Sequence, residues 1–457
     1  MINLNKSMDS MSAEQKLQIL RMLYRKSLSA FIQKSFGIVS PGDKYLHNWH
    51  IDVIADKLEK CVNGEIKRLI ITVPPRYGKS ICVSVAFIAW LLGHKPHSKI
   101  IGVSYGNDLS EKHSQDCKKL MESGFYSEVF PGTKLSARDN TKALFRTCHG
   151  GYRISTSVGG PLTGLGGDFL IIDDPIKPQD ALSETQRKHI NNWYDNTLYT
   201  RLNDKQNGCI IIVMQRVHED DLAGHVLDQE DWVHLNLPAI AEQAEEHLIH
   251  PFGRGQKLFR RKEGEALHPE REPLEQLNKL RTVQLGSYNF SAQYQQKPAP
   301  LGGGLIKYDW FQVYTQLPEE GYIRTIQSWD TASKTENHND YSVCTTWHEY
   351  EHGYYLADLF RKRLDFPYLV REVKKLYEKY RPNSVVIEDK SSGINLIQQL
   401  QTETKIPVFG HMPKTDKKTR AMTMTPHIEA GKVFVFKYAA WLAELESEVI
   451  HFPNGKH

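Results

Sequence analysis

The chain has 457 residues, of which 40% are hydrophobic and 25% are charged, and its formal net charge is +4. This composition is typical of a water-soluble protein with more than one core, and the charge permits a nucleic-acid partner without requiring one. No run of about 18 apolar residues is present to cross a membrane, and the polar N-terminus lacks the apolar centre of a signal peptide. Six scattered cysteines without a CxxC pair favour reduced thiols over zinc or disulfides. The sequence therefore predicts a cytoplasmic protein of at least two domains with no membrane partner.

Residues 13–60 carry apolar side chains at three-to-four spacing, which predicts amphipathic helices. The next segment, RLIITVPPRYGKS at 68–80, is the most informative of the chain. An apolar, β-branched run stops at two prolines, and a helical pattern begins directly after Ser80. The segment therefore predicts a buried strand, a tight loop and the first turn of a helix.

This arrangement suits the triphosphate of a nucleotide. Backbone N–H groups of the loop, including those of Tyr77 and Gly78, can hold phosphate oxygens. Lys79 can neutralise the β- and γ-phosphates, and the Ser80 hydroxyl can coordinate Mg²⁺. Val73 stands where the usual pattern has its first glycine, so the loop is an atypical one.

Strands and helices alternate from 65 to 237, and the near-continuous apolar strands predict a parallel sheet covered on both faces. The segment FLIIDDP at 169–175 places two carboxylates at the tip of one such strand. Asp173 suits a ligand of Mg²⁺, and Asp174 suits the group that polarises the attacking water. The alternative is an acidic turn, because Asp before Pro is common in turns. The spacing from Lys79 fits a strand of the same sheet and favours the first interpretation.

Two further polar residues each have two interpretations. Gln215 follows the buried strand GCIIIVM, where it could sense the γ-phosphate; alternatively it marks a strand end before a helix whose dipole is favoured by Asp220 and Asp221. Arg76 could stabilise transition-state charge from within the phosphate loop, as arginine fingers do. Otherwise it is a surface arginine beside a proline turn.

The second half of the chain carries a different chemistry. Residues 238–305 are charge-rich and are expected to form an irregular connector; three short strands, a helix and a further strand then follow in the order of an RNase H-like nuclease. Asp330 ends the first of these strands, Asp340 opens the second, and Glu388 and Asp389 end the last. Converging carboxylates can hold two Mg²⁺ or Mn²⁺ ions about 4 Å apart. Only one of Glu388 and Asp389 can face the metals, since side chains alternate along a strand.

The predicted fold class is α/β: a P-loop ATPase with a parallel sheet covered by helices, followed by an RNase H-like α/β nuclease domain. No internal repeat interrupts this order. The expected parts are an N-terminal helical segment (1–44), the ATPase domain (45–237), the connector (238–305) and a nuclease domain that is incomplete at its C-terminus (306–457).

These motifs together resemble one family, the large terminase subunit of tailed bacteriophages and prophages. The resemblance runs from about Tyr45 to the end of the sequence. It is carried by HNWHIDVIADKLE, VPPRYGKS, GDFLIIDDPIK, WYDNTLYTRL, QRVHEDDLAG, ALHPEREPLEQL, GSYNFSAQYQQKPAPLGGG, SWDTASKTENHNDYSV and VVIEDKSSG. It implies an ATP-driven motor that moves double-stranded viral DNA into a procapsid, together with a metal-dependent endonuclease. It further implies a small terminase subunit, the portal protein and a ring of identical copies as partners, in the cytoplasm of a bacterial host.

By the same resemblance, Trp49 and His50 fall in the segment that approaches the adenine. In the family, a segment like FPNGKH at 452–457 continues into an acidic stretch that supplies the last metal-binding Asp, so we expect this nuclease to lack that ligand. The two alternatives are a helicase-like DNA-remodelling ATPase and an inactive prophage relic. The residues that match the family's ATP and nuclease sites are Arg76, Lys79, Ser80, Asp173, Asp174, Asp330 and Glu388.

Overall fold

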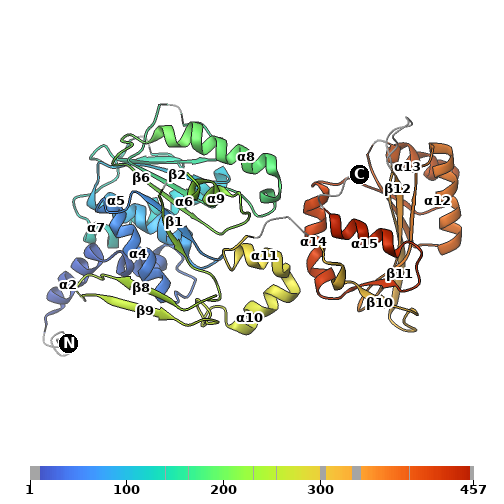
Figure 1. Cartoon of the computed structure of the whole chain (residues 1–457). Coiled ribbons are helices and arrows are strands. Elements are labelled where there is room, and N and C mark those ends of the chain that lie inside the picture. Colours follow the sequence, from blue (N-terminus) through green and yellow to red (C-terminus); the bar gives the residue numbers. More distant parts are fainter. Residues whose placement is uncertain are drawn as a thin grey trace. The chain divides into compact units, whose positions relative to one another are not determined.

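The computed structural model describes residues 11–138, 140–162, 164–229, 231–253, 255–298, 305–331, 341–390 and 392–452. The chain divides into two compact units, which are coloured along the sequence in Figure 1. The N-terminal unit comprises Met1–Lys279 and Tyr288–Ala299, and the C-terminal unit comprises Leu280–Ser287 and Pro300–His457. None of the helices in the described ranges has the length and apolar character needed to span a membrane.

A seven-stranded sheet with the order β3-β4-β2-β5-β6-β1-β7 forms the centre of the N-terminal unit. Neighbouring strands run parallel, except that β3 is antiparallel to β4. Because β6 lies between β1 and β5, the tips of these three strands meet at one edge. The strands are β1 (Arg68–Thr72), β2 (Lys99–Ser104), β3 (Leu144–Arg146), β4 (Tyr152–Ser157), β5 (Phe169–Asp173), β6 (Cys209–Met214) and β7 (Val233–Asn236).

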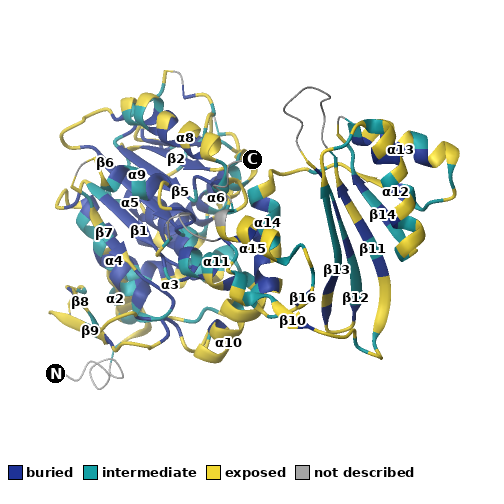
Figure 2. Cartoon of the chain, turned by 45° about the vertical axis from the view of Figure 1, so that its right-hand side comes forward, coloured by how far each residue is buried: buried dark blue, intermediate teal, exposed yellow. Residues whose placement is uncertain are grey.

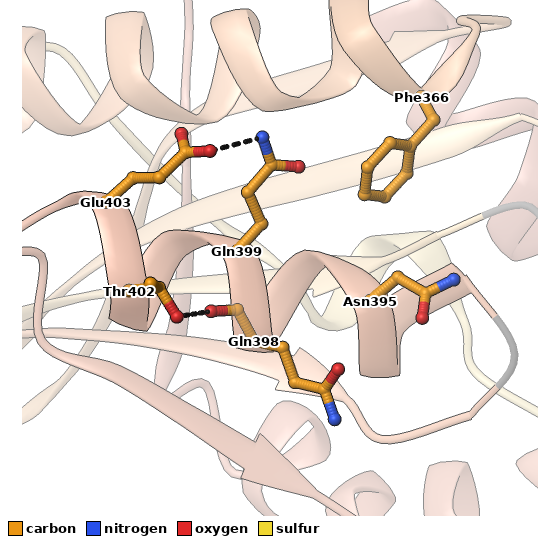
Figure 3. Close-up of a pocket in the computed structure, with 6 residues that line it drawn as sticks. All are labelled: Phe366, Asn395, Gln398, Gln399, Thr402 and Glu403. Carbon is orange, nitrogen blue, oxygen red and sulfur yellow. Dashed lines mark hydrogen bonds between the residues drawn. The ribbon is translucent and has the colours of Figure 1, made fainter.

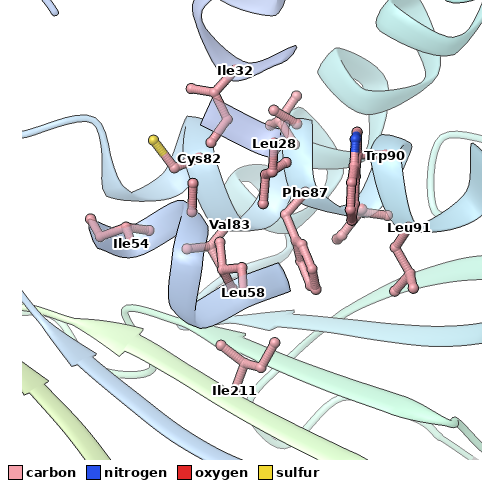
Figure 4. Packing of buried hydrophobic residues seen from close by; sticks show 14 of the residues in the cluster. Leu28, Ile32, Ile54, Leu58, Cys82, Val83, Phe87, Trp90, Leu91 and Ile211 are labelled. Atoms are coloured by element: carbon pink, nitrogen blue, oxygen red, sulfur yellow. The ribbon is translucent and has the colours of Figure 1, made fainter. Parts of the chain in front are cut away.

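Helices cover both faces of this sheet. On one face, Ile71 and Ile211 belong to a core with α3, α4, η1 and α5, part of which Figure 4 shows around Leu58 and Phe87. On the other face, Ile70 and Ile212 pack with residues of α8, η3 and α9. The helical elements are α2 (Ala13–Lys26), α3 (Leu28–Val39), α4 (Trp49–Val62), η1 (Ile81–Phe87), α5 (Ile88–His94), α6 (Asn107–Met121), α7 (Gly124–Val129), η2 (Asp180–Leu182), α8 (Glu184–Trp193), η3 (Tyr194–Leu198), η4 (Tyr199–Arg201) and α9 (Leu222–Leu227).

The segment 238–305, for which the sequence predicts an irregular connector, contains regular elements. The antiparallel hairpin of β8 (Glu245–Ile249) and β9 (Lys257–Arg261) is followed by α10 (Leu274–Lys279), η5 (Leu280–Leu285) and α11 (Gly286–Gln293). Charged residues are frequent in the hairpin and obscure the alternation by which a strand is recognised. Its ends are joined by an ion pair between Arg261 Nη2 and Glu245 Oε1, 2.8 Å apart.

The C-terminal unit is built on a second seven-stranded sheet, with the order β10-β16-β13-β12-β11-β14-β15. Here β11, β12 and β13 form an antiparallel meander, while β14 joins β11 in parallel. The strands are β10 (Gln312–Tyr314), β11 (Tyr322–Asp330), β12 (Ser342–Tyr350), β13 (Gly353–Lys362), β14 (Ser384–Glu388), β15 (Val408–His411) and β16 (Val433–Phe436); the helices are η6 (Tyr308–Trp310), α12 (Phe366–Tyr380), α13 (Ser392–Glu403), α14 (Lys417–Glu429) and α15 (Leu442–His451).

One face of this second sheet is covered by α12 and α13, where Trp329 and Ile387 are buried. Figure 2 shows buried and more exposed positions interspersed along β11, in contrast to the almost wholly buried β5 and β6. Asp330, next to Trp329, is exposed because successive side chains of a strand point to opposite faces. The α/β class with parallel-rich sheets is thus confirmed.

Candidate functional site

The phosphate loop links β1 to η1 and adopts a strained backbone. Gly78 has φ of 81°, and Arg76 has φ of 68°, a left-handed conformation that side chains other than glycine rarely adopt. Tyr77 and Lys79 are buried, whereas Arg76 between the proline pair and Tyr77 is exposed. The loop therefore turns one charged side chain into the protein and the other outward.

Lys79 meets the acidic tip of β5. Its Nζ lies 3.0 Å from Asp174 Oδ2, and both side chains are largely buried. Asp174 reaches this position with φ of 45°, and its Oδ1 accepts a hydrogen bond from the backbone N–H of Gln215 at 3.2 Å. The tips of β1, β5 and β6 are thereby joined through a single carboxylate.

Asp173 is more deeply buried and faces the first turn of η1. Its two carboxylate oxygens accept hydrogen bonds from the Ser80 hydroxyl at 3.2 Å and the Ser84 hydroxyl at 2.6 Å. Burial raises the pKa of Asp173 and of Asp174, and the nearby Lys79 ammonium opposes that rise. A hydroxyl and a carboxylate that face each other beside a lysine offer the oxygen ligands that Mg²⁺ prefers, so the residues present fit a nucleotide-bound Mg²⁺.

At the tip of β6, the two polar residues differ in their environment. Gln215 Oε1 is buried and has no hydrogen-bond partner within the described structure, so this oxygen is unsatisfied beside the Lys79–Asp174 pair. Arg216, in contrast, is held by Asp221, whose two carboxylate oxygens each lie 2.9 Å from its Nε. The Arg216 guanidinium is therefore engaged within its own loop.

Trp49 and His50 begin α4 and have separate surroundings. His50 is buried, and its Nε2 lies 3.0 Å from the carbonyl oxygen of Tyr77 in the phosphate loop. Burial lowers the pKa of His50 to about 3, so the ring is neutral at pH 7 and can donate to this carbonyl. Trp49 instead stacks on Phe259 of the β8–β9 hairpin, with ring centroids 5.8 Å apart. The structure thus connects His50, but not Trp49, directly to the loop.

Two buried groups behind Asp173 were not among the residues predicted from sequence. His113 on α6 places Nδ1 3.6 Å from Asp173 Oδ2, and burial lowers its pKa to about 4, so it is neutral at pH 7. Arg153 on β4 is 1% exposed and donates from Nη1 to the His113 carbonyl oxygen at 2.9 Å. A lone arginine inside the buried strand YRISTS was the available signal for Arg153.

In the C-terminal unit, Asp330 and Glu388 lie on neighbouring parallel strands. Trp329 is in register with Ile387, so each acid follows an aligned buried residue and points to the opposite face of the sheet. Asp389 comes after β14 and extends over β15, where its Oδ2 lies 3.5 Å from the place that a Cβ on Gly410 would occupy. Asp340 lies outside the described residues. No group of three or more potential ligands that could hold a metal is found among the residues the structure describes.

The carboxylates of Asp330 and Glu388 are paired with cationic side chains, most of them from α14. Lys417 Nζ lies 2.9 Å from Asp330 Oδ2, and Arg420 Nη2 lies 3.5 Å from Glu388 Oε2. Lys390 Nζ is 3.7 Å from Glu388 Oε1. The two carboxylates are therefore already balanced by positive charge. A divalent cation bound between them would supply the same balance, so the acid pair fits a metal site in its charge. These cationic partners could not be predicted from the sequence. Lys390 is close to Glu388 in the chain, whereas Lys417 and Arg420 are distant from the acids, and none of the three belongs to a recognisable motif.

A shallow polar groove lies elsewhere in the same unit. It is lined by Phe366 of α12 and by five polar residues of α13 (Figure 3), which cover the sheet face opposite to Asp330 and Glu388. Gln399 Nε2 donates to Glu403 Oε1 at 2.8 Å within α13, and Lys374 of α12 donates to Glu403 Oε2 at 3.1 Å. It has no part in the acid site. The five polar residues are Asn395, Gln398, Gln399, Thr402 and Glu403.

The fold and the two sites define a class of protein in which a phosphate-loop α/β unit is followed by an RNase H-like α/β unit. Residues 327–457 match the family described as the terminase RNaseH-like domain, in agreement with the terminase resemblance of the motifs in that part of the chain. No curated protein matches the sequence.

Similar solved structures come from bacteriophages. The large terminase of a thermophilic bacteriophage, solved in complex with ADP, is 13% identical, with a TM-score of 0.47, over 86% of this chain and 90% of that chain. The HK97 large terminase is 12% identical, with a TM-score of 0.38, over 90% of each chain. The large terminase nuclease of the thermophilic phage G20c with bound magnesium is 20% identical, with a TM-score of 0.25, over 32% of this chain and 81% of that chain.

Proposed function

We propose that this chain is the large subunit of a terminase: an ATP-driven motor that moves double-stranded viral DNA into a procapsid, joined to a metal-dependent endonuclease. The observation that carries the proposal is the convergence of Lys79, Ser80, Asp173 and Asp174 at one sheet edge in a chain whose residues 327–457 match a terminase nuclease family. Neither half alone distinguishes a terminase from other ATPases or nucleases.

In the ATPase unit, we assign the binding of the β- and γ-phosphates to Lys79 and to backbone N–H groups of the loop at Tyr77 and Gly78. Ser80 and Asp173 would hold Mg²⁺, which neutralises developing phosphate charge. Asp174 would orient the attacking water, once the phosphates attract Lys79 away from its carboxylate. This assignment rests on the present 3.0 Å contact, because the lysine that neutralises Asp174 in the free protein is the one that ATP would engage.

Two residues of this site would act around the phosphates. The unsatisfied Oε1 of Gln215 can accept a hydrogen bond from the attacking water. Arg76 is exposed, and within the described structure no hydrogen bond or ion pair holds its guanidinium, so it can reach bound phosphate. Trp49 and His50 remain proposed contacts near the adenine. His50 is linked to the phosphate loop by its contact with the Tyr77 carbonyl oxygen, and Trp49 is held by its stacking on Phe259 of the β8–β9 hairpin.

In the nuclease unit, Asp330 and Glu388 would hold Mg²⁺ or Mn²⁺, supported by Asp340 or Asp389. A bound divalent ion would polarise the phosphodiester and activate water for attack. Double-stranded DNA is the substrate of both units under this proposal. The small terminase subunit, the portal protein and other copies of the chain in a ring would be its partners in the bacterial cytoplasm.

The proposal is tested by purified variants assayed for ATP hydrolysis with and without duplex DNA, and for plasmid cleavage with Mn²⁺. We expect Lys79→Ala to abolish hydrolysis and weaken nucleotide binding, and Asp174→Asn to bind ATP without turning it over. Asp330→Ala should abolish cleavage while DNA-stimulated hydrolysis persists. Lys188→Ala, which removes a lysine of an exposed ion pair on α8, is the control and should behave as the parent.

Each outcome has a clear consequence. Hydrolysis at the parent rate by Asp174→Asn would show that another group orients the water. An ATPase that duplex DNA does not stimulate would contradict the motor function. Cleavage that survives Asp330→Ala would remove the assigned acid from the nuclease site.

A further inference from the structure

The face of the second sheet that bears Asp330 carries three charged side chains at one strand end. Asp330 on β11 is paired in register with Val343 on β12, which is paired in turn with Arg361 on β13. Glu388 of β14 lies on the other side of Asp330, so two acids and one arginine share this face. Arg361 is engaged by Glu444 and Glu448 of α15, the second at 3.1 Å, and is thus neutralised within the fold.

The cations facing the two acids are bound differently. Lys417 and Asp330 form an ion pair whose side chains are 62% and 51% exposed, so solvent screens the pair and little holds the ammonium there. Arg420 and Glu388 are separated by 3.5 Å and are more buried. Both cations come from one face of the first turns of α14, since they are three residues apart.

A divalent ion bound by Asp330 and Glu388 would compete with these side chains for the same carboxylate oxygens. Displaced from the acids, Lys417 and Arg420 would remain tethered to α14 within reach of whatever occupies the metals' open side. In a nuclease that occupant is a phosphodiester, whose negative charge would replace the carboxylates as the partner of these cations.

We propose that Lys417 and Arg420 are exchangeable phosphate-binding residues: they neutralise Asp330 and Glu388 in the metal-free protein, and they bind the scissile strand's phosphate groups once metal ions occupy the acids. This inference rests on the proposed nuclease function. It assigns a substrate contact to α14, an element outside the acid-bearing strands. It also makes DNA binding by this unit dependent on the metal.

The alternative role for Lys417 is structural, an ion pair that fastens α14 to the sheet. Lys418 provides a matched control, because it is the next residue, carries the same charge and forms no ion pair with an acid of the described chain. Its substitution changes the net charge by the same amount without removing a partner of Asp330. Arg420→Lys tests whether charge alone suffices at the second position.

The experiment uses the full chain without nucleotide. Free Mn²⁺ is followed by its electron paramagnetic resonance signal, and the affinity for a short duplex is followed by fluorescence anisotropy in EDTA or in Ca²⁺ at several salt concentrations. Lys417→Gln should bind Mn²⁺ roughly 2- to 5-fold more tightly, because a competing cation is gone. In Ca²⁺ it should bind duplex more weakly, with a log–log salt slope lower by about one. In EDTA the loss of duplex affinity should be smaller than in Ca²⁺, since Lys417 is then paired with Asp330.

Combination with Asp330→Asn sharpens the test. In that background the lysine has lost its acid, so Lys417→Gln should weaken duplex binding even in EDTA. The proposal is overturned if Lys417→Gln and Lys418→Gln have equal effects on metal and DNA, or if Lys417→Gln lowers only the thermal unfolding midpoint. Unchanged Mn²⁺ binding in Asp330→Asn would instead contradict the proposed metal site, whatever Lys417 does for DNA.

Discussion

Arg76 combines a costly backbone conformation with an exposed side chain. A residue other than glycine at φ of 68° costs about 1–2 kcal/mol, and such strain is found at functional sites where the surrounding structure maintains it. The neighbouring prolines and buried Tyr77 restrict the loop, so the guanidinium is directed outward beside Lys79 without a partner in the described structure. This geometry favours a role with bound phosphate over that of an ordinary surface arginine.

We therefore predict that Arg76→Ala lowers kcat for ATP with little change in KM, because a finger acts on the transition state and not on ground-state binding. The loss should be large, about 10³-fold in a favourable case. Steady-state ATPase kinetics measure it, with Arg76→Lys as a variant that keeps the positive charge. An alanine variant with the parent kcat would show that Arg76 is an ordinary surface arginine with no role in hydrolysis.

His50 couples the start of α4 to the phosphate loop and makes stability depend on pH. Unfolded, its imidazole binds a proton below about pH 6.5; folded, it does so only near its lowered pKa of about 3. The neutral ring therefore stabilises the fold above pH 6.5, and this contribution falls by about 1.4 kcal/mol for each unit as the pH drops from 6.5 toward 3.

Urea unfolding at about pH 7 and about pH 5 checks this expectation for the N-terminal unit. The parent should lose stability between the two values more steeply than His50→Gln, by about one proton's worth of slope. His113 and His234, whose pKa values burial lowers to about 4, remain in both proteins, so the difference isolates His50. Equal slopes in the two proteins would show that His50 is not buried neutral.

At the scale of elements, the turn between β6 and α9 depends on one carboxylate. Asp221 is buried, accepts from Arg216 Nε at 2.9 Å, and accepts from the backbone N–H groups of Val217 and Gly224 at 3.0 Å, the latter as the N-cap of α9. The sequence interpretation of this segment as a strand end before a capped helix holds for Asp221. The cap also fixes the direction in which the chain leaves Gln215.

Asp221→Ala should destabilise the N-terminal unit by about 3–5 kcal/mol, because it leaves the Arg216 guanidinium buried without its counter-ion and uncaps the helix. Asp228→Ala is the control, since Asp228 lies exposed at the C-terminal end of the same helix and its loss should cost about 1 kcal/mol or less. Denaturant midpoints compare the two variants. A small effect at Asp221 would mean that water or another acceptor replaces the carboxylate.

At the scale of the whole molecule, the sequence was informative wherever a motif is local. Lys79 and Ser80 follow an apolar strand within a few residues, and Asp173 and Asp174 end another, so parallel pairing was enough to predict their meeting. The sequence does not state which strands are neighbours in the second sheet. Once β11 and β14 are known to be paired, the alternation of side chains is consistent with the alignment of Trp329 with Ile387.

What sequence could not supply are contacts without a periodic or local signal. Lys417 and Arg420 lie on a helix whose pattern does not indicate that they face acids located 87 and 32 residues away along the chain. Arg153 looked like an interruption of a strand until its burial behind Asp173 was seen. The segment Leu280–Ser287 likewise carried no sign that it would fold with the C-terminal unit, where η5 packs on α14 and Ser287 N–H donates to Glu429 at 2.8 Å.

That last feature bears on proteolysis. The chain passes between the two units three times, after Lys279, after Ser287 and after Ala299, and the first two passages fall within helical segments: at the junction of α10 with η5, and inside α11. A proteolytic cut after Ser287 would therefore divide both units between the two fragments, and packing within each unit would hold the fragments together.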